Sequence, residues 1–128
     1  GRELNLMPLT VTVIDVAGVV RATLSEQGSG LIRSDIAYAK AWTCLAFNVS
    51  SNTLRDVFEG QPRLAPAVTG MQTMAGGKLV PTPGGMLIQK DGKNIGAVGV
   101  TGDVSDQDEI CAIAGIEASN LTPGHKSK

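Results

Sequence analysis

Glycine is the residue that most constrains this chain, and 16 of its 128 residues are glycines. Two glycine-rich stretches in the C-terminal half interrupt runs of strand-forming residues. Glycine is locally costly inside a strand, so it usually marks a bulge or a place where another backbone or a ligand comes close. The stretches are Pro81–Met86 and Gly96–Gly102, and Asp91-Gly92 between them is a strong hairpin signal. We therefore predict two paired strands, Gly85–Lys90 and Lys93–Thr101.

The first half of the chain predicts another hairpin and two helices. Leu9–Asp15 is rich in β-branched residues, and Val19–Leu24 resumes this character after a glycine. The apolar spacing then changes to that of a helix over Arg33–Asn48. Ser50 or Ser51 can cap a shorter helix that runs to about Phe58.

The rest of the chain is less uniform. Val68–Gly77 fits either a short helix or a loop leading to a strand at Lys78–Val80. Ser105 stands three residues before Asp108, the spacing of a helix capping box, and Thr122–Lys128 resembles a frayed polar tail. We predict a single α+β domain over residues 1–128, with residues 121–128 as a tail and an antiparallel sheet of about five strands flanked by helices.

The helix predicted over Arg33–Asn48 is apolar on two sides. One side carries Ile36, Lys40 and Cys44, and another carries Tyr38 and Trp42. A helix that is apolar on two sides must be covered on both. In so small a domain, the second cover is expected to be another subunit, so we predict a homo-oligomer.

One ordered set of motifs carries a family resemblance. Pro-x-Pro-Gly-Gly-hydrophobic is followed by the hairpin, then by Gly-Ala-hydrophobic-Gly-Val-Thr-Gly, and then by Gln107-Asp108-Glu109 and Ala114-Gly115. This order resembles the GlcG/HbpS-like family, which includes haem-binding proteins and the C-terminal domain of PduO-type corrinoid adenosyltransferases. The resemblance runs from about Leu9 to Ile116.

The resemblance carries several implications. It implies a profilin-like sheet with helices on both faces, and assemblies from dimers up to octamers. Family members usually have a helix before the first strand, so Gly1–Leu4 is interpreted as the remnant of a truncated helix. Haem is the implied cofactor, and a corrinoid is the runner-up.

Composition narrows the functional classes. A formal net charge of -1 without a cluster of Lys or Arg disfavours nucleic acid as a partner. No apolar run approaches the roughly 20 residues of a membrane span, and no signal segment stands at the start. We expect a soluble, cytoplasmic protein without a membrane partner. Secretion stays open because the N-terminus looks truncated.

Lys40 is the most informative polar residue, because it lies on the apolar Ile36–Cys44 side of a helix. A lysine there either extends its ammonium to water or meets a buried acid or an anionic ligand. The resemblance adds weight to a ligand, since the family pattern has a Lys-Ala pair at this place, here Lys40-Ala41.

Backbone groups supply the other binding candidates. Gly84 and Gly85 are required by a turn with positive φ, or they let a ligand lie against bare backbone. Thr101 and Gly102, at the exit of the last predicted strand, could offer N–H groups to a carboxylate. We therefore predict a cofactor-binding site of Lys40 with these four residues.

Acidic residues give the catalytic candidates. Asp103, Asp106, Asp108 and Glu109 cluster around the start of the last helix, where capping and the helix dipole explain them more simply than a metal does. We predict no metal site. Asp15 is interpreted as a turn residue, or as a site residue at the same end of the sheet as Lys40. Lys40 with Asp15 or Asp108 is the acid–base pair to test.

Cysteine and histidine limit the possible chemistry. Cys44 and Cys111 each stand alone in a helical pattern and are expected to be buried small hydrophobes. His125, the single histidine, lies in the predicted tail, so a histidine-ligated haem does not transfer from the family. Methionine, Cys44, Cys111 and Tyr38 remain as possible haem ligands in the core.

Three functions follow from these observations. The first is a binding protein for a small, carboxylate-bearing cofactor, with haem or another tetrapyrrole implied by the resemblance. The second is a cofactor-free enzyme that acts on a small organic acid through Lys40. The third is an accessory oligomerisation domain without a ligand of its own.

Overall fold

The computed structural model describes residues 7–102 and 105–124. Five strands form one antiparallel sheet in the order β2-β1-β4-β3-β5. The strands are β1 (Thr10–Asp15), β2 (Val20–Ser25), β3 (Gly85–Lys90), β4 (Lys93–Thr101) and β5 (Thr122–Gly124). The predicted α+β fold with an antiparallel sheet of about five strands is confirmed.

Both predicted hairpins are present. In the β3–β4 hairpin, Asp91 and Gly92 have φ of 53° and 79°, the left-handed pair that a tight two-residue turn requires. In the β1–β2 hairpin, the Asp15 carboxylate accepts hydrogen bonds from the backbone N–H groups of Ala17 and Val19 at 2.9 and 3.1 Å. Both turns therefore form from local sequence signals.

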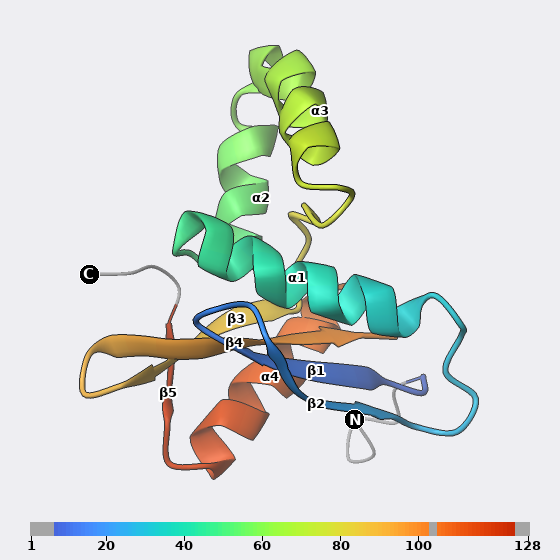
Figure 1. The fold of residues 1–128 in the computed structure, drawn as a ribbon, viewed down its shortest axis with the longest axis vertical. Coiled ribbons are helices and arrows are strands. Elements are labelled where there is room, and N and C mark those ends of the chain that lie inside the picture. Colours follow the sequence, from blue (N-terminus) through green and yellow to red (C-terminus); the bar gives the residue numbers. More distant parts are fainter. Residues whose placement is uncertain (1–6, 103–104, 125–128) are drawn as a thin grey trace.

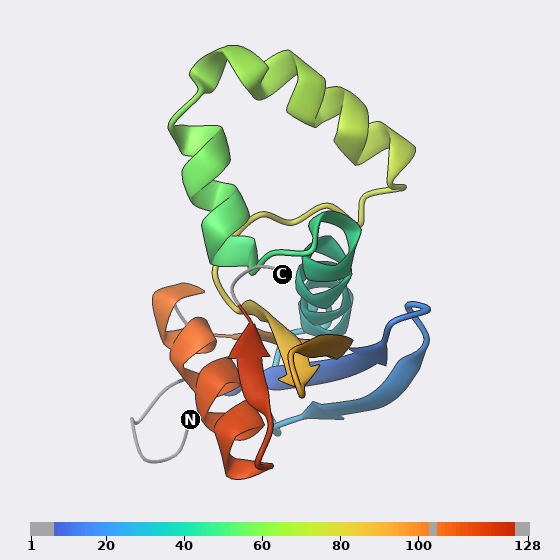
Figure 2. The same cartoon turned by 90° about the vertical axis from the view of Figure 1, so that its left-hand side faces the viewer.

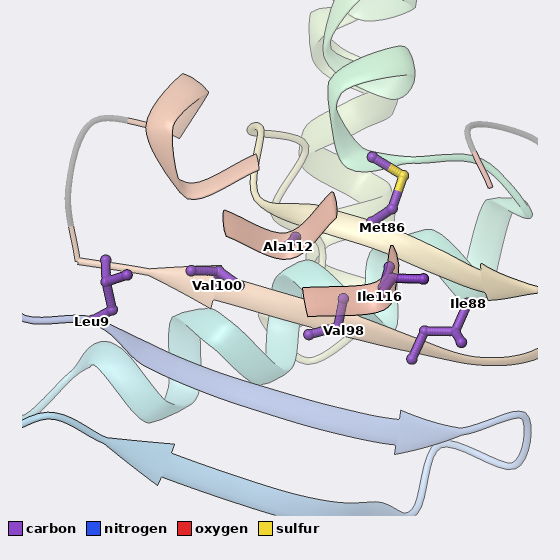
Figure 3. Packing of buried hydrophobic residues seen from close by; sticks show 7 residues of the cluster. All are labelled: Leu9, Met86, Ile88, Val98, Val100, Ala112 and Ile116. Atoms are coloured by element: carbon purple, nitrogen blue, oxygen red, sulfur yellow. The ribbon is translucent and has the colours of Figure 1, made fainter. Parts of the chain in front are cut away.

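Helices cover both faces of the sheet (Figures 1 and 2). The helix α1 (Arg33–Phe47) lies on one face and α4 (Ser105–Ala118) on the other. Figure 3 shows the apolar core between the sheet and α4, where Met86, Val98 and Val100 of the strands meet Ala112 and Ile116. A second core, which includes Ile14, Ala41, Cys44, Leu87 and Ala97, joins α1 to the sheet.

A helical arm stands away from the sheet beyond α1 (Figures 1 and 2). It consists of α2 (Ser51–Glu59), the short 3-10 helix η2 (Pro62–Leu64) and α3 (Ala65–Met74). The side chain of Ser50 caps α2, accepting from the Thr53 N–H at 3.2 Å, as predicted. No residue of α3 is buried within the described part of the chain.

Two predicted elements are wrong and one ambiguity is resolved. The ambiguous Val68–Gly77 region is mostly helix α3, while Lys78–Val80 forms no strand and instead runs along α1. The fifth strand comes from the predicted tail, because Thr122–Gly124 pairs with Leu87–Gln89 as β5. The strand β5 is stabilised by hydrogen bonds to the edge of β3, which would otherwise be open. A three-residue segment contains no local pattern that could predict this pairing.

Three expectations concern residues outside the described ranges. They are the truncated helix at Gly1–Leu4, the place of Asp103 in the acidic cluster and the tail position of His125. Within the ranges that are described, no helix is long and apolar enough to span a membrane.

Candidate functional site

The predicted pair Lys40–Asp108 forms inside the protein. The Lys40 Nζ lies 3.1 Å from the Asp108 Oδ2 and donates a second hydrogen bond to the Val100 carbonyl at 2.9 Å. Both side chains are almost fully buried, with 3% and 1% of their surfaces exposed. The ion pair therefore joins α1, β4 and α4 at one end of the sheet.

Burial determines the electrostatics of Lys40. Desolvation lowers the pKa of the Lys40 ammonium below its ordinary value of 10.5, and the neighbouring Asp108 carboxylate opposes this shift. The positive charge of Arg33 adds to the lowering. Lys40 is thus held as a buried cation whose ammonium already has two protein acceptors.

Gly84 and Gly85 explain how the pair fits. Gly84 has φ of 123°, and a Cβ there would come within 2.8 Å of the Lys40 Nζ. A Cβ on Gly85 would lie 2.5 Å from the Lys40 carbonyl oxygen and 2.8 Å from the Cys44 Sγ. Residues of α1 therefore occupy the space beside Gly84 and Gly85, where the sequence predicted that a ligand could lie.

The start of β3 is also tied to the arm. The Gly85 N–H donates to the Ser51 Oγ at 2.9 Å, and both residues are buried. Cys44, beside them, has its pKa raised to about 12 by burial. The prediction that Cys44 is a buried small hydrophobe is confirmed, whereas Cys111 is only half-buried.

Thr101 and Gly102 lie at the same end of the sheet. The Thr101 Oγ1 accepts a hydrogen bond from Arg33 Nη1 at 3.2 Å, and the Thr101 side chain is buried. Gly102 has φ of 144°, and a Cβ there would collide with the backbone of Pro8 and Leu9. These residues thus fix the chain entering β1.

Asp15 is not part of this cluster. The β1–β4 register pairs Thr10 with Thr101 but Asp15 with Gly96, so Asp15 lies at the opposite end of β1. Its carboxylate holds the β1–β2 turn and an exposed Arg21 contact at 3.4 Å. The expectation that Asp15 shares a sheet end with Lys40 is wrong, because the strand runs its full length between them.

An apolar cavity of about 400 Å³ lies between the sheet and α4. Its lining is almost entirely aliphatic and includes Val11, Val98, Ile88 and Ile116, with Cys111 and Ser119 contributing heteroatoms. Its described lining residues include neither a cation nor an aromatic ring. The cavity can therefore receive apolar groups but offers nothing to a carboxylate.

A second hollow, of about 320 Å³, lies on the other side of the molecule between α1 and α3. Sequence reasoning missed it because α3 was ambiguous and its facing residues stand some 30 positions apart. The available signal was the pair Met71 and Met74, at helical spacing and close to Lys78. Among the described residues, no group of three His, Cys, Asp or Glu side chains is placed to hold a metal ion.

Comparison with known proteins adds an independent finding. The family described as haem degrading protein HbpS-like matches residues 2–117. The corrinoid adenosyltransferase PduO of Salmonella typhimurium is 32% identical over 115 residues, which cover 90% of this chain and 33% of that protein. The chain thus spans about a third of the length of the curated relatives it matches.

Two solved structures resemble this chain over most of its length. A PduOC–heme complex has a TM-score of 0.83 and 31% identity, covering 98% of this chain and 86% of that one. A double mutant of Streptomyces reticuli HbpS has a TM-score of 0.72 and 28% identity, covering 88% and 71% of the two chains.

Proposed function

Because the chain belongs to the haem degrading protein HbpS-like family, as its glycine motifs predicted, we propose that it binds haem or a closely related tetrapyrrole. The likeness to a PduOC structure solved with heme, over 98% of this chain, is the observation that carries the proposal. Two apolar hollows of about 400 and 320 Å³ support it, since cofactor pockets are concave and mostly apolar. A corrinoid is the runner-up ligand.

Titration with hemin tests this function. We expect a saturable, shifted Soret band with a fixed stoichiometry for each chain. Aquocobalamin, titrated in the same way, tests the corrinoid. If hemin gives only the unsaturable spectrum of free and aggregated hemin, the tetrapyrrole proposal is wrong.

We keep a role for Lys40 in ligand binding as a secondary proposal, after haem binding itself. To reach a propionate, the ammonium would have to leave Asp108 and the Val100 carbonyl, although its side chain is only 3% exposed. Gly84, Gly85, Thr101 and Gly102 also leave no space for a ligand, because protein atoms fill their surroundings. These residues support the fold at this end of the sheet.

The lysine-centred enzyme is the second candidate, favoured by the lowered pKa of Lys40. A lysine of lowered pKa gives up its proton more readily than an ordinary lysine, and can act as a base once substrate reaches it. Borohydride trapping of a carbonyl compound on Lys40 tests this function. Absence of a lysine adduct across a panel of small oxo acids would remove the carbonyl-binding role of Lys40, and absence of Lys40-dependent proton exchange at the α-carbon of these acids would remove the acid–base role.

We also propose that the chain forms a homo-oligomer through the β2 edge. All six residues of β2 are exposed, including Val20 at 46% and Leu24 at 76%. An open edge strand that exposes apolar side chains is a ready template for pairing with another chain. Light scattering of Leu24→Lys should give a smaller assembly than the parent protein, and an unchanged mass would contradict the role of β2. If the parent itself is a monomer, the oligomer proposal fails.

A further inference from the structure

The hollow between α1 and α3, called here the α1–α3 groove, combines three kinds of side chain. It is lined by Trp42 and Phe47 of α1, Met71 and Met74 of α3, and Lys78 and Leu79 of the segment that follows. Trp42 also borders a smaller hollow of about 190 Å³ beside the β1–β2 turn, so its ring stands between two open spaces. The indole is therefore accessible along the outer side of α1.

The segment on one side of the groove is firmly held. The Val80 N–H donates to the Thr43 Oγ1 at 2.8 Å, and the Leu79 N–H donates to the Gln72 side-chain carbonyl at 2.9 Å. These bonds tie the segment to α1 and to α3. The groove is thus a defined hollow although α3 buries none of its own residues.

A positive charge lies directly against the aromatic wall. The Lys78 Nζ is 5.3 Å from the centroid of the Trp42 ring, a cation–π distance. Lys78 is half-buried, and its ammonium can turn toward an anion at the mouth of the groove while its stem stays packed. The groove therefore offers an aromatic ring with a movable cation lying over it.

The opposite wall carries two thioethers. Met71 is half-buried, whereas Met74 is 87% exposed, and the spacing of three residues places both on one side of α3. Thioether sulfur is one of the few protein groups that ligate haem iron. Methionine side chains normally lie in a core. Two methionines on an open wall opposite a tryptophan therefore indicate a surface that binds another molecule.

We propose that the α1–α3 groove binds the tetrapyrrole, with its ring on Trp42, a propionate on Lys78 and the iron on the Met71 thioether. This inference rests on the proposed function and assigns its site. The groove fits a carboxylate-bearing macrocycle better than the larger cavity beneath α4, whose described lining residues include no cation and no ring. Met71 is assigned as the ligand because it is the less exposed of the two methionines.

Ligation and stacking are separated by using two probes, hemin and metal-free protoporphyrin. Met71→Leu should remove the thioether signature from the magnetic circular dichroism of ferric hemin and weaken hemin binding about tenfold. It should leave protoporphyrin affinity unchanged. Lys78→Gln should weaken both probes several-fold, since each carries propionates.

The matched controls are Met74→Leu on the same helix and Cys111→Ser in the cavity beneath α4. Both should bind hemin with the parent spectrum. If Met74→Leu removes the thioether signature instead, the assignment to Met71 is wrong. If Cys111→Ser changes the hemin spectrum or weakens hemin binding, the site lies beneath α4. If hemin saturates the parent and all four variants identically, this site is wrong while the proposed function stands. If hemin does not saturate even the parent, the proposed function itself fails.

Discussion

The two sides of α1 use polar residues in opposite ways. On the inner side, Lys40 is buried against Asp108 and the Val100 carbonyl, and glycines at the start of β3 let the backbones approach closely. On the outer side, Lys78 lies over Trp42 beside an open hollow. One lysine is fully engaged by protein, and the other is placed where a ligand could engage it.

A lysine on an apolar helix face is therefore not by itself evidence of a ligand. The space around Lys40 is filled, so a ligand there would have to displace an existing buried ion pair. A ligand in the α1–α3 groove would displace mainly water and a cation–π contact, at far lower cost. We therefore attribute stability to the inner side of α1 and propose that binding takes place at the outer side.

The largest expected effect comes from breaking the inner ion pair. Lys40→Met leaves the Asp108 carboxylate buried without its cation, which should cost about 3–5 kcal/mol of unfolding free energy. Adding Asp108→Leu should restore part of this loss, because the orphaned charge is removed. Urea unfolding of the two singles and the double gives the coupling energy. Additive losses would show that the pair is not coupled.

Gly85→Val should destabilise the protein by about 3 kcal/mol, because its Cβ would lie 2.5 Å from the Lys40 carbonyl oxygen. Thermal unfolding by circular dichroism measures the loss. Gly115→Ala is the control, since nothing lies within 4 Å of its Cβ position and alanine favours a helix by roughly 0.5–1 kcal/mol. Equal melting temperatures for Gly85→Val and the parent would refute the close approach of α1 and β3.

Alkaline pH should reveal the buried lysine. The folded-state pKa of Lys40 lies below its ordinary 10.5, so between these two values the unfolded chain binds more protons than the folded one. The difference in stability between the parent and Lys40→Met should therefore shift in favour of the parent as pH rises toward 10.5. Each unit of pKa shift corresponds to about 1.4 kcal/mol. A pH-independent difference would mean that the pKa of Lys40 is unchanged by folding.

The two thiols should react at different rates, with little effect on stability. Cys44 is buried and its pKa is raised to about 12, so it should stay unreactive toward a thiol reagent at pH 8 until the protein unfolds. Cys111 is half-buried and should react first. Timed mass spectrometry after labelling identifies each site. Equal labelling of both cysteines in the folded protein would contradict the packing around Cys44.

Local signals predicted much of the fold. The Asp91-Gly92 turn, the β-branched runs and the period of α1 are consequences of neighbouring residues, and each formed as expected. The strand at Lys78–Val80 was a wrong prediction, and β5 was missed in the predicted tail. A short extended segment becomes a strand only when it pairs with a strand distant in the sequence, and a local pattern holds no information about that partner.

The site was predictable only in part, for the same reason. The sequence singled out Lys40, Asp108, Gly84 and Gly85, and the structure brings all four together. It could not reveal that α1 fills the space beside the glycines, or that Asp15 lies at the other end of β1. The α1–α3 groove joins residues some 30 positions apart across a helical arm, so the spacing of Met71 and Met74 alone could not show which residues they face.

The most direct test uses Trp42, the single tryptophan of the chain. Its indole N–H gives one unambiguous cross-peak in a proton–nitrogen correlation spectrum, and zinc protoporphyrin is a diamagnetic tetrapyrrole whose ring current falls steeply with distance. We predict a large upfield shift of this peak that saturates together with the porphyrin absorbance. A porphyrin that binds with saturation but leaves the Trp42 peak in place would contradict binding at the outer side of α1.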